Sequence, residues 1–173
     1  MASNIRLVEP TMEYEEQILR FRQALLDAND REGFAGCAWL EDYTDVGEWL
    51  KFLAKLKTTK ERVPSDLYLA VRISDSKVVG VIEFRHHIDH PILGLWGGHI
   101  GYTVCPTERG KGYSKEMLRQ NLEKCRVLGL DKVLITCNDD NIASERTILA
   151  NGGVFEHTVE VGGSTIKRYW ITL

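Results

Sequence analysis

The stretch Val104-Cys105-Pro106-Thr107-Glu108-Arg109-Gly110-Lys111-Gly112-Tyr113-Ser114 joins two segments of different periodicity. The segment before it, residues 99–104, alternates like a strand, and Pro106 should end that strand because proline cannot donate to a ladder. After the stretch, apolar residues recur at helical spacing as far as Leu128. The sequence therefore predicts a strand, a short loop with two glycines and two cations, and then the first turn of a helix.

This glycine loop, residues 109–114, has the composition of an anion-binding site. The first amides of a helix lack intrahelical partners, and the helix dipole favours negative charge there. Gly110 and Gly112 allow the backbone to approach an anion closely, while Arg109 and Lys111 add positive charge. The loop is neither a Walker A loop nor a Gly-x-Gly-x-x-Gly motif. A glycine-containing loop before a helix also occurs in proteins that bind no phosphate, so a structural role is the alternative.

Composition limits the class of protein. A chain of 173 residues with 43% hydrophobic and 27% charged residues fits one soluble globular domain, residues 1–173. The net charge of −3 gives no general electrostatic reason to bind nucleic acid or an anionic membrane. No apolar run is long enough to span a bilayer and the N-terminus lacks a signal-peptide core, so we expect a cytoplasmic protein.

The cysteines and histidines give no sign of a metal site. The four cysteines are scattered, which favours reduced thiols, and the five histidines do not fall at zinc-ligand spacing with them. His86, His87 and His90 form a polar cluster, but the first two point to opposite faces of a strand. We therefore favour a surface or substrate-mouth role for this cluster over metal binding.

Periodicity and turn residues predict the order of elements along the chain. The predicted elements are a strand (5–8), a helix from residue 11, a helix from an N-cap at Thr44 or Asp45 to residue 57, a hairpin (67–73 and 77–88), a loop (89–98), the strand 99–104, a helix ending at Gly129, a strand (133–137), a helix (142–150) and a hairpin (154–161 and 165–172). A strand–helix–strand unit in the middle requires one parallel pair. The fold class is therefore α/β (α+β), with a mixed sheet.

The glycine loop resembles the acetyl-CoA pyrophosphate loop of the GNAT superfamily of N-acetyltransferases, whose pattern is Gln/Arg-x-x-Gly-x-Gly/Ala. Arg109 fills the first place and Gly112 the middle one, while Ser114 stands where glycine or alanine is usual. The order of elements also matches, so the resemblance covers nearly the whole chain and is strongest over residues 98–155. The wording of residues 97–113 looks like an uncharacterised bacterial branch of predicted acetyltransferases.

The resemblance implies a fold and a cofactor. The fold would be the GNAT acyl-CoA N-acyltransferase fold, with a mostly antiparallel sheet, a splayed central parallel strand pair (99–104 and 133–137) and helices on both faces. The cofactor would be acetyl-CoA, whose pantetheine arm would lie between the splayed strands and pair with their backbone. The residues expected to bind coenzyme A are Thr103, Val104, Arg109, Gly110, Lys111, Gly112, Tyr113, Ser114, Asn141 and Ser144.

Acyl transfer to an amine needs a base, an oxyanion donor and an acid. His99 titrates near neutrality and falls where many GNAT enzymes place a catalytic glutamate, but it also suits a structural role in a sheet. Glu83, in the middle of a strand, is the second candidate, as a base or as an anchor for the substrate amine, and a cross-strand ion pair is its alternative role. The family implies a backbone amide near Val104 as the oxyanion donor.

The sequence leaves the acid and the acceptor open. Many GNAT enzymes use a tyrosine as the acid, and its place here is taken by Ile148, which leaves Tyr102, Tyr113 and Tyr169 available. We expect the acceptor pocket between segment 29–45, loop 89–98 and the last hairpin. Aromatic and acidic residues there suit a small cationic amine, although a solvated acidic loop would look the same. These residues are Trp39, Glu41, Asp42 and Tyr43.

The expected activity is direct acetyl transfer from acetyl-CoA to a small-molecule or peptide amine in a ternary complex. No covalent enzyme intermediate is needed, since Cys105 has no assigned base. An acyl-CoA sensor or inactive module is the alternative that the residue at position 148 suggests. Another phosphate-bearing ligand, such as a nucleotide, is a third possibility. Many proteins of this fold form homodimers, and the sequence does not decide whether this one does.

Overall fold

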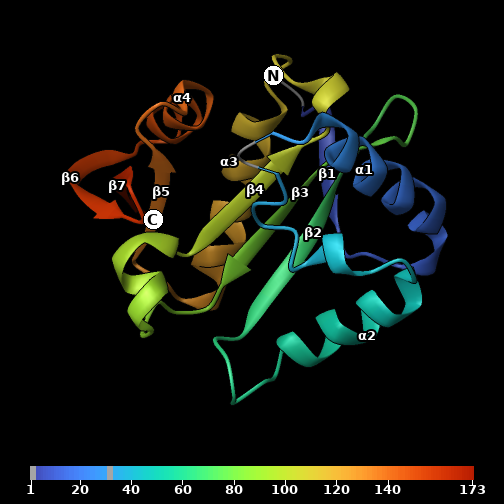
Figure 1. The fold of residues 1–173 in the computed structure, drawn as a ribbon, viewed down its shortest axis with the longest axis horizontal. Coiled ribbons are helices and arrows are strands. Elements are labelled where there is room, and N and C mark those ends of the chain that lie inside the picture. The colour runs from blue at the N-terminus through green and yellow to red at the C-terminus, as the bar shows by residue number, and fades with distance from the viewer. Residues whose placement is uncertain (1–2, 31–32) are drawn as a thin grey trace.

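The computed structural model describes residues 3–30 and 33–173, which form two antiparallel sheets with helices packed around them (Figure 1). The first sheet has the strand order β1-β2-β3-β4 and the second the order β5-β7-β6. The elements are β1 (Ile5–Val8), η1 (Met12–Tyr14), α1 (Glu15–Ala28), η2 (Leu40–Asp42), α2 (Val46–Leu56), β2 (Ser65–Arg72), β3 (Val78–Arg85), η3 (Leu93–Gly97), β4 (Ile100–Val104), η4 (Pro106–Glu108), α3 (Tyr113–Leu128), β5 (Lys132–Asn138), α4 (Ile142–Ala150), β6 (Val154–Val161) and β7 (Ser164–Thr172). The α/β class and the order of elements predicted from the sequence are confirmed.

The helix ends follow the capping residues in the sequence. The carboxylate of Asp45 accepts a hydrogen bond of 3.0 Å from the amide of Glu48, so Asp45, rather than Thr44, is the N-cap of α2. Gly129, with a φ of 90°, ends α3 in the left-handed region. At its other end α3 begins directly after Gly112, so the N-terminus of the helix meets the glycine loop.

Two apolar cores lie on opposite faces of the first sheet. One packs α1 and α2 against the sheet through Ile18, Trp49 and Val81. The other joins the sheet to α3 and to the second sheet through Met117 and Ile135. Because both faces of the sheet are covered, the backbone of β4 is held rigidly at the centre of the molecule (Figure 1).

The central strands β4 and β5 are splayed, as the family resemblance implied, but they stand in two antiparallel sheets instead of one mixed sheet. β4 and β5 belong to different sheets, and β4 begins at Ile100 instead of residue 99. Their backbones meet where the amide of His99 donates to the carbonyl of Leu134 over 2.8 Å. Gly98 allows this approach, since a Cβ there would lie 2.7 Å from the Leu134 carbonyl oxygen. The two strands are thus joined at one end and open at the other.

The segment predicted as a plain loop, residues 89–98, contains the short π-helical turn η3. Side chains from other elements hold its carbonyl groups. Arg168 donates to Gly94 and Leu95, Arg85 to Gly97 and Gly98, and Thr136 to Trp96. The apolar side chains of this turn remain on the surface. The glycines of this segment did not predict the turn, because the side chains that hold its carbonyl groups come from distant parts of the chain.

Two further findings concern features expected from the sequence. Among the described residues the four cysteines form no disulfide. Within residues 3–30 and 33–173, no helix combines the length and the apolar character needed to cross a bilayer.

Candidate functional site

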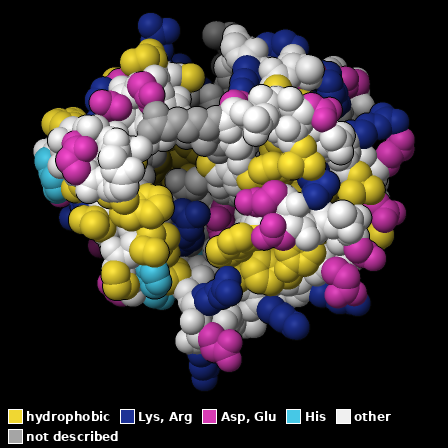
Figure 2. Space-filling view, viewed as in Figure 1, with side chains coloured by type: hydrophobic (Ala, Val, Ile, Leu, Met, Phe, Trp, Pro, Cys, Tyr) yellow, Lys and Arg dark blue, Asp and Glu magenta, His cyan; other side chains and the backbone are white. Residues whose placement is uncertain are grey.

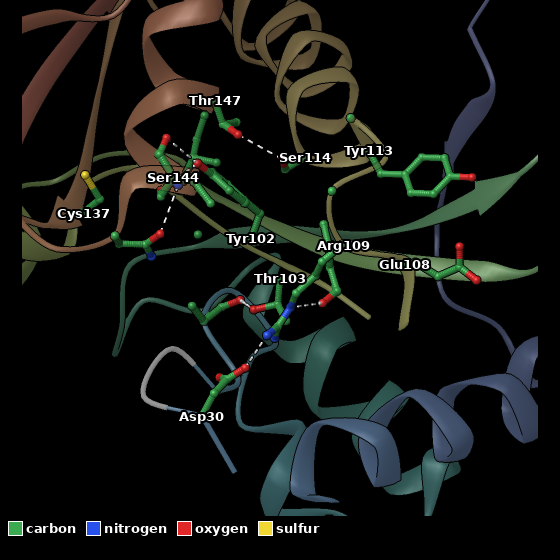
Figure 3. Close-up of a pocket in the computed structure, with 18 of the residues that line it drawn as sticks. Asp30, Tyr102, Thr103, Glu108, Arg109, Tyr113, Ser114, Cys137, Ser144 and Thr147 are labelled. Atoms are coloured by element: carbon green, nitrogen blue, oxygen red, sulfur yellow. Dashed lines mark hydrogen bonds and ion pairs between the residues drawn. The ribbon is translucent and has the colours of Figure 1, made fainter. Parts of the chain in front are cut away.

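A cleft of about 490 Å³ opens between β4 and the end of β5 (Figure 3). One wall is β4 with the glycine loop, and the other is the end of β5 with the start of α4. The lining residues include nine of the ten that the sequence pointed to: Thr103, Val104, Arg109, Gly110, Gly112, Tyr113, Ser114, Asn141 and Ser144. The structure therefore brings together residues that are up to 41 positions apart in the chain.

The glycine loop presents unpartnered backbone to this cleft. Gly110 and Gly112 have φ values of 75° and 82°, and a Cβ on either would meet no atom within 4 Å. Gly112 is the N-cap of α3 and has no side chain to cap it. Within the described part of the chain, no protein acceptor bonds to the amides of Gly110, Gly112, Tyr113 or Ser114. The loop is therefore a set of donors without acceptors at a positive helix end.

Lys111 is the expected cofactor residue that does not line the cleft. Its ammonium donates to the carboxylate of Glu108 over 2.8 Å, and the same buried carboxylate also pairs with Lys77 and Arg72. Hydrogen bonds from Lys111 and Lys77 lower the pKa of Glu108 to about 2. Figure 3 shows Glu108 and Tyr113 pointing away from the Ser144 wall, and the hydroxyl of Tyr113 lies 3.2 Å from Arg72. This charge cluster anchors the loop from behind.

Arg109 lies across the mouth of the cleft. Its guanidinium pairs with the carboxylate of Asp30, and its Nε donates to the Val104 carbonyl over 3.3 Å (Figure 3). Asp30 follows α1, so this pair links the glycine loop to the segment before η2. Sequence reasoning missed Asp30, because an acidic residue after a helix carries no distinctive signal.

Hydroxyl groups line the opposite wall. Asn141 caps α4 by accepting from the amide of Ser144 over 3.0 Å, and the Ser144 hydroxyl lies 2.8 Å from that of Tyr102. Ser114 is joined in the same way to Thr147, at 2.9 Å. Thr147 was missed by sequence reasoning, although it follows Ser144 by three residues and so shares its face of the helix.

The two candidate bases lie outside the lining of the cleft, next to its closed end. Nδ1 of His99 accepts a hydrogen bond of 2.9 Å from the amide of Leu134, and burial lowers the pKa of His99 to about 4. Glu83, opposite Gly101 in the register of β3 and β4, accepts from Ser65 over 2.9 Å and pairs with Arg85 at 3.0 Å. Both residues are 5% exposed. Their role as bases stays a prediction.

The sequence left three tyrosines and the position of Ile148 to consider for the general acid, and the structure gives each different surroundings. Ile148 is fully buried in the core. The hydroxyl of Tyr169 bonds to Glu145 outside the cleft, and that of Tyr113 faces Arg72. The hydroxyl of Tyr102 faces the cleft wall at Ser144. Of the three tyrosines, Tyr102 is therefore the one whose hydroxyl lies between the two walls.

The expected acceptor side has both apolar and acidic surface. Trp39 is 49% exposed and packs its ring against Phe52, with the Arg62 guanidinium 5.2 Å above it. Figure 2 shows hydrophobic side chains on both sides of a hollow, and the exposed apolar residues of η3 include Leu95 and Trp96. One carboxylate oxygen of Glu41 is buried without a hydrogen-bond partner in the described residues. Residues 31 and 32 of segment 29–45 lie outside the described residues.

The segment before η2 is fixed to β4 by close backbone contact. The Thr103 hydroxyl donates to the carbonyl of Ala35 over 2.7 Å. Gly36 packs against Gly101 so closely that a Cβ on Gly101 would lie 2.9 Å from the Gly36 Cα. Asp30 and Ala35 of this segment line the cleft beside β4. Within the described chain, no three His, Cys, Asp or Glu residues are grouped as a metal site would need.

Comparisons with known proteins agree with this geometry. The family model described as "Acetyltransferase (GNAT) domain" matches residues 11–154. No curated protein matches the chain in sequence. Among solved structures, the microcin self-immunity acetyltransferase MccE in complex with acetyl-CoA and AMP has a TM-score of 0.69 at 20% identity, over 99% of this chain and 94% of that one.

Two other solved structures are similar. The ribosomal-protein α-N-acetyltransferase RimL in complex with coenzyme A has a TM-score of 0.69 at 18% identity, over 99% of this chain and 96% of that one. The third is a chimera of the spermidine N-acetyltransferase SpeG from Vibrio cholerae with hSSAT. It has a TM-score of 0.65 at 15% identity, over 98% of this chain and 96% of that one. At these identities the likeness concerns the fold.

Proposed function

The chain belongs to the GNAT acetyltransferase family, and we propose that it transfers an acetyl group from acetyl-CoA to a primary amine by direct transfer in a ternary complex. The observation that carries the proposal is the row of unpartnered amides at Gly110, Gly112, Tyr113 and Ser114, which faces the cleft at the N-terminus of α3. Two of the similar structures hold acetyl-CoA or coenzyme A.

The cleft fits coenzyme A in charge and in backbone chemistry. The amides of the glycine loop suit a pyrophosphate, and positive φ at Gly110 and Gly112 keeps side chains out of its place. Arg109 would join them after leaving Asp30 and the Val104 carbonyl. β4 pairs with β3 along one edge, so its other edge, with the backbone groups of Val104, lies toward the cleft for the pantetheine amides. Bound acetyl-CoA supplies an activated acetyl thioester.

Glu83 is the proposed proton acceptor for the amine. Its carboxylate is buried and pairs with the guanidinium of Arg85 at 3.0 Å. Glycine at position 101, directly opposite, leaves no side chain between the carboxylate and β4. His99 is the weaker candidate, because its Nδ1 lone pair already accepts from Leu134.

Tyr102 is the proposed proton donor to the leaving thiolate. Its hydroxyl lies in the cleft wall, hydrogen-bonded to the Ser144 hydroxyl; after giving its proton to the thiolate, Tyr102 would be a phenolate that accepts a hydrogen bond from Ser144 until it regains a proton from solvent. The assignment replaces the tyrosine that the family places where this chain has Ile148. The amide at Val104 remains the proposed oxyanion donor.

The proposed acceptor is an amine that also carries a cationic or apolar part. The buried carboxylate oxygen of Glu41 suits a positive charge, and the exposed rings of Trp39 and Trp96 offer apolar surface. Spermidine and protein N-termini, the acceptors that the names of two similar enzymes indicate, are both of this kind.

Thiol release from acetyl-CoA in the presence of a panel of amines tests the function. The panel should hold polyamines, free amino acids and peptides with free N-termini. Thiol release above the hydrolysis rate with one class supports the proposal and identifies that class. Coenzyme A binding without turnover on any amine would indicate a sensor instead. Stabilisation by ATP or NAD rather than coenzyme A would indicate a different ligand.

A further inference from the structure

The His99 ring takes part in the junction between the two sheets. The His99 amide donates to the Leu134 carbonyl over 2.8 Å, and the Leu134 amide donates to Nδ1 of His99 over 2.9 Å. The residue that precedes β4 therefore uses both its backbone and its side chain to pair with one residue of β5. The ring also packs at an angle of 64° against Trp170, which lies opposite Leu134 in β7.

The position of this contact explains why a side chain is needed. In a parallel ladder the Leu134 amide would meet a backbone carbonyl of the neighbouring strand. With the His99 amide on the Leu134 carbonyl, that acceptor would be the carbonyl of Gly97, which lies in η3 and accepts from Arg85 instead. Leu134 is fully buried, so water cannot replace the missing carbonyl. The imidazole nitrogen takes the place of that acceptor.

This contact also fixes the state of the ring. A nitrogen that accepts an N–H bond carries no proton, so the neutral His99 ring has its proton on Nε2. A base would have to use Nδ1, and it could do so only by breaking the bond to Leu134. The same lone pair cannot serve both purposes at once.

We propose that His99 is a positioning residue, which holds β4 and β5 together at the closed end of the cleft and thereby sets the spacing of the two walls that receive coenzyme A. The inference rests on the proposed function for the identity of that ligand. The junction itself is a property of the protein alone. The wall-to-wall spacing matters because Thr103 and Val104 lie on one side and Asn141 and Ser144 on the other.

The test compares two substitutions that both remove a base but differ in whether they can accept a hydrogen bond from Leu134. In His99→Asn, the amide oxygen is two bonds from Cβ, as Nδ1 is, and can accept from Leu134, but it cannot act as a base. In His99→Phe, the ring is kept and the acceptor is lost. We expect the affinity for coenzyme A, measured by calorimetry, to fall about tenfold in His99→Phe and to change less than about threefold in His99→Asn.

Amide hydrogen exchange gives a readout that needs no ligand. The Leu134 amide should exchange at least about tenfold faster in His99→Phe than in the wild type, while His99→Asn keeps it protected. His157→Phe, at an exposed histidine of β6, is the matched control and should alter neither value. Equal affinity and exchange in His99→Phe and the wild type would overturn the proposal, as would equal losses in both His99 variants.

A measurement on the wild type covers the case in which His99→Phe does not fold. Nitrogen NMR of the His99 ring should show an unprotonated Nδ1 and a protonated Nε2 at neutral pH, and a protonated Nδ1 overturns the proposal. If the wild type binds no coenzyme A, the proposed function fails, while the ring tautomer and the Leu134 exchange rate still decide the role of His99.

Discussion

Arg109 of the glycine loop pairs with Asp30, which precedes it by 79 residues, and so closes an ion pair over the cleft. The same side chain donates to the Val104 carbonyl, one of the groups expected to face the pantetheine arm. Arg109 must therefore exchange protein partners for phosphate when coenzyme A binds. The pair links ligand binding to the segment after α1, where the acceptor is expected.

Replacing Asp30 should strengthen binding. Asp30→Asn removes the competing carboxylate, and since a partly exposed ion pair contributes about 0.2–1 kcal/mol, affinity for coenzyme A should rise up to about fivefold. Arg109→Ala should weaken binding in contrast, and Asp30→Asn should have no further effect in that background. Calorimetry at low and high salt measures all three, and a weaker affinity in Asp30→Asn alone would contradict the competition.

A matched pair of glycine substitutions tests whether the amides of the glycine loop bind coenzyme A. Gly112 and Gly129 cap opposite ends of α3 with positive φ, and a Cβ on either meets no protein atom. Alanine at either position should cost about 1–2 kcal/mol of stability through the same backbone strain. Only Gly112→Ala should reduce coenzyme A affinity, by about tenfold or more. Equal affinities of the two variants would show that the loop is not the binding site.

The charge cluster behind the loop predicts a response to acid. The pKa of Glu108 is lowered to about 2 from its ordinary value of 4.5, so its stabilising effect is complete above pH 4.5 and is lost as the pH falls toward 2. Glu108→Gln should lose about 2 kcal/mol at pH 7 and show a flatter dependence in that window. Urea unfolding between pH 2 and pH 6 measures this. Parallel curves would show that Glu108 titrates normally.

His99 predicts a second window at higher pH. Its pKa is about 4 in the folded protein, against 6.5 for an ordinary histidine, so the unfolded chain takes up a proton first. Stability attributable to the neutral ring is present above pH 6.5 and falls as the pH is lowered toward 4. Arg85, His87 and Asp89 are the charged or titratable groups that act on the ring. The wild type should lose stability over this window more steeply than His99→Asn, as urea midpoints would report.

The proposed acid is tested by the two tyrosines of the cleft. Tyr102→Phe removes the hydroxyl beside Ser144 and should lower kcat about 10²-fold with little change in the KM for acetyl-CoA. Tyr113→Phe removes a hydroxyl that faces Arg72 and serves as the control, with kcat nearly unchanged. A thiol-release assay compares them once an acceptor is known. A full kcat in Tyr102→Phe would leave thiolate protonation to another group or to water.

Much of the fold and most of the cleft could be predicted from the sequence, because local signals decided them. Asp45 and Gly129 cap their helices as capping preferences indicate, and the glycine loop joins a strand to a helix as Pro106 and the two glycines suggested. The ten expected cofactor residues gathered at one cleft except Lys111, which turned to Glu108. The local sequence around Lys111 would be the same whether its ammonium bound a phosphate or the carboxylate of Glu108, so this contact could not be predicted.

The parts that were not predictable depend on contacts distant in the chain. Asp30 and Arg109 meet across the cleft, and η3 is held by Arg85 and Arg168 from other strands. Alternation placed His99 on a face of β4, but it could not show that the strand would begin one residue later. The lone pair of its ring then replaces the ladder carbonyl of Gly97, which η3 turns toward Arg85.

The central claim is that the unpartnered amides at the start of α3 hold the pyrophosphate of coenzyme A. Titration of the isotope-labelled protein with coenzyme A, followed through its backbone amide signals, tests this most directly. The account predicts that the largest shifts fall on Gly110, Gly112, Tyr113 and Ser114, with the β4 amides next. Saturable binding with the largest shifts away from the cleft, or no binding at millimolar coenzyme A, would contradict it.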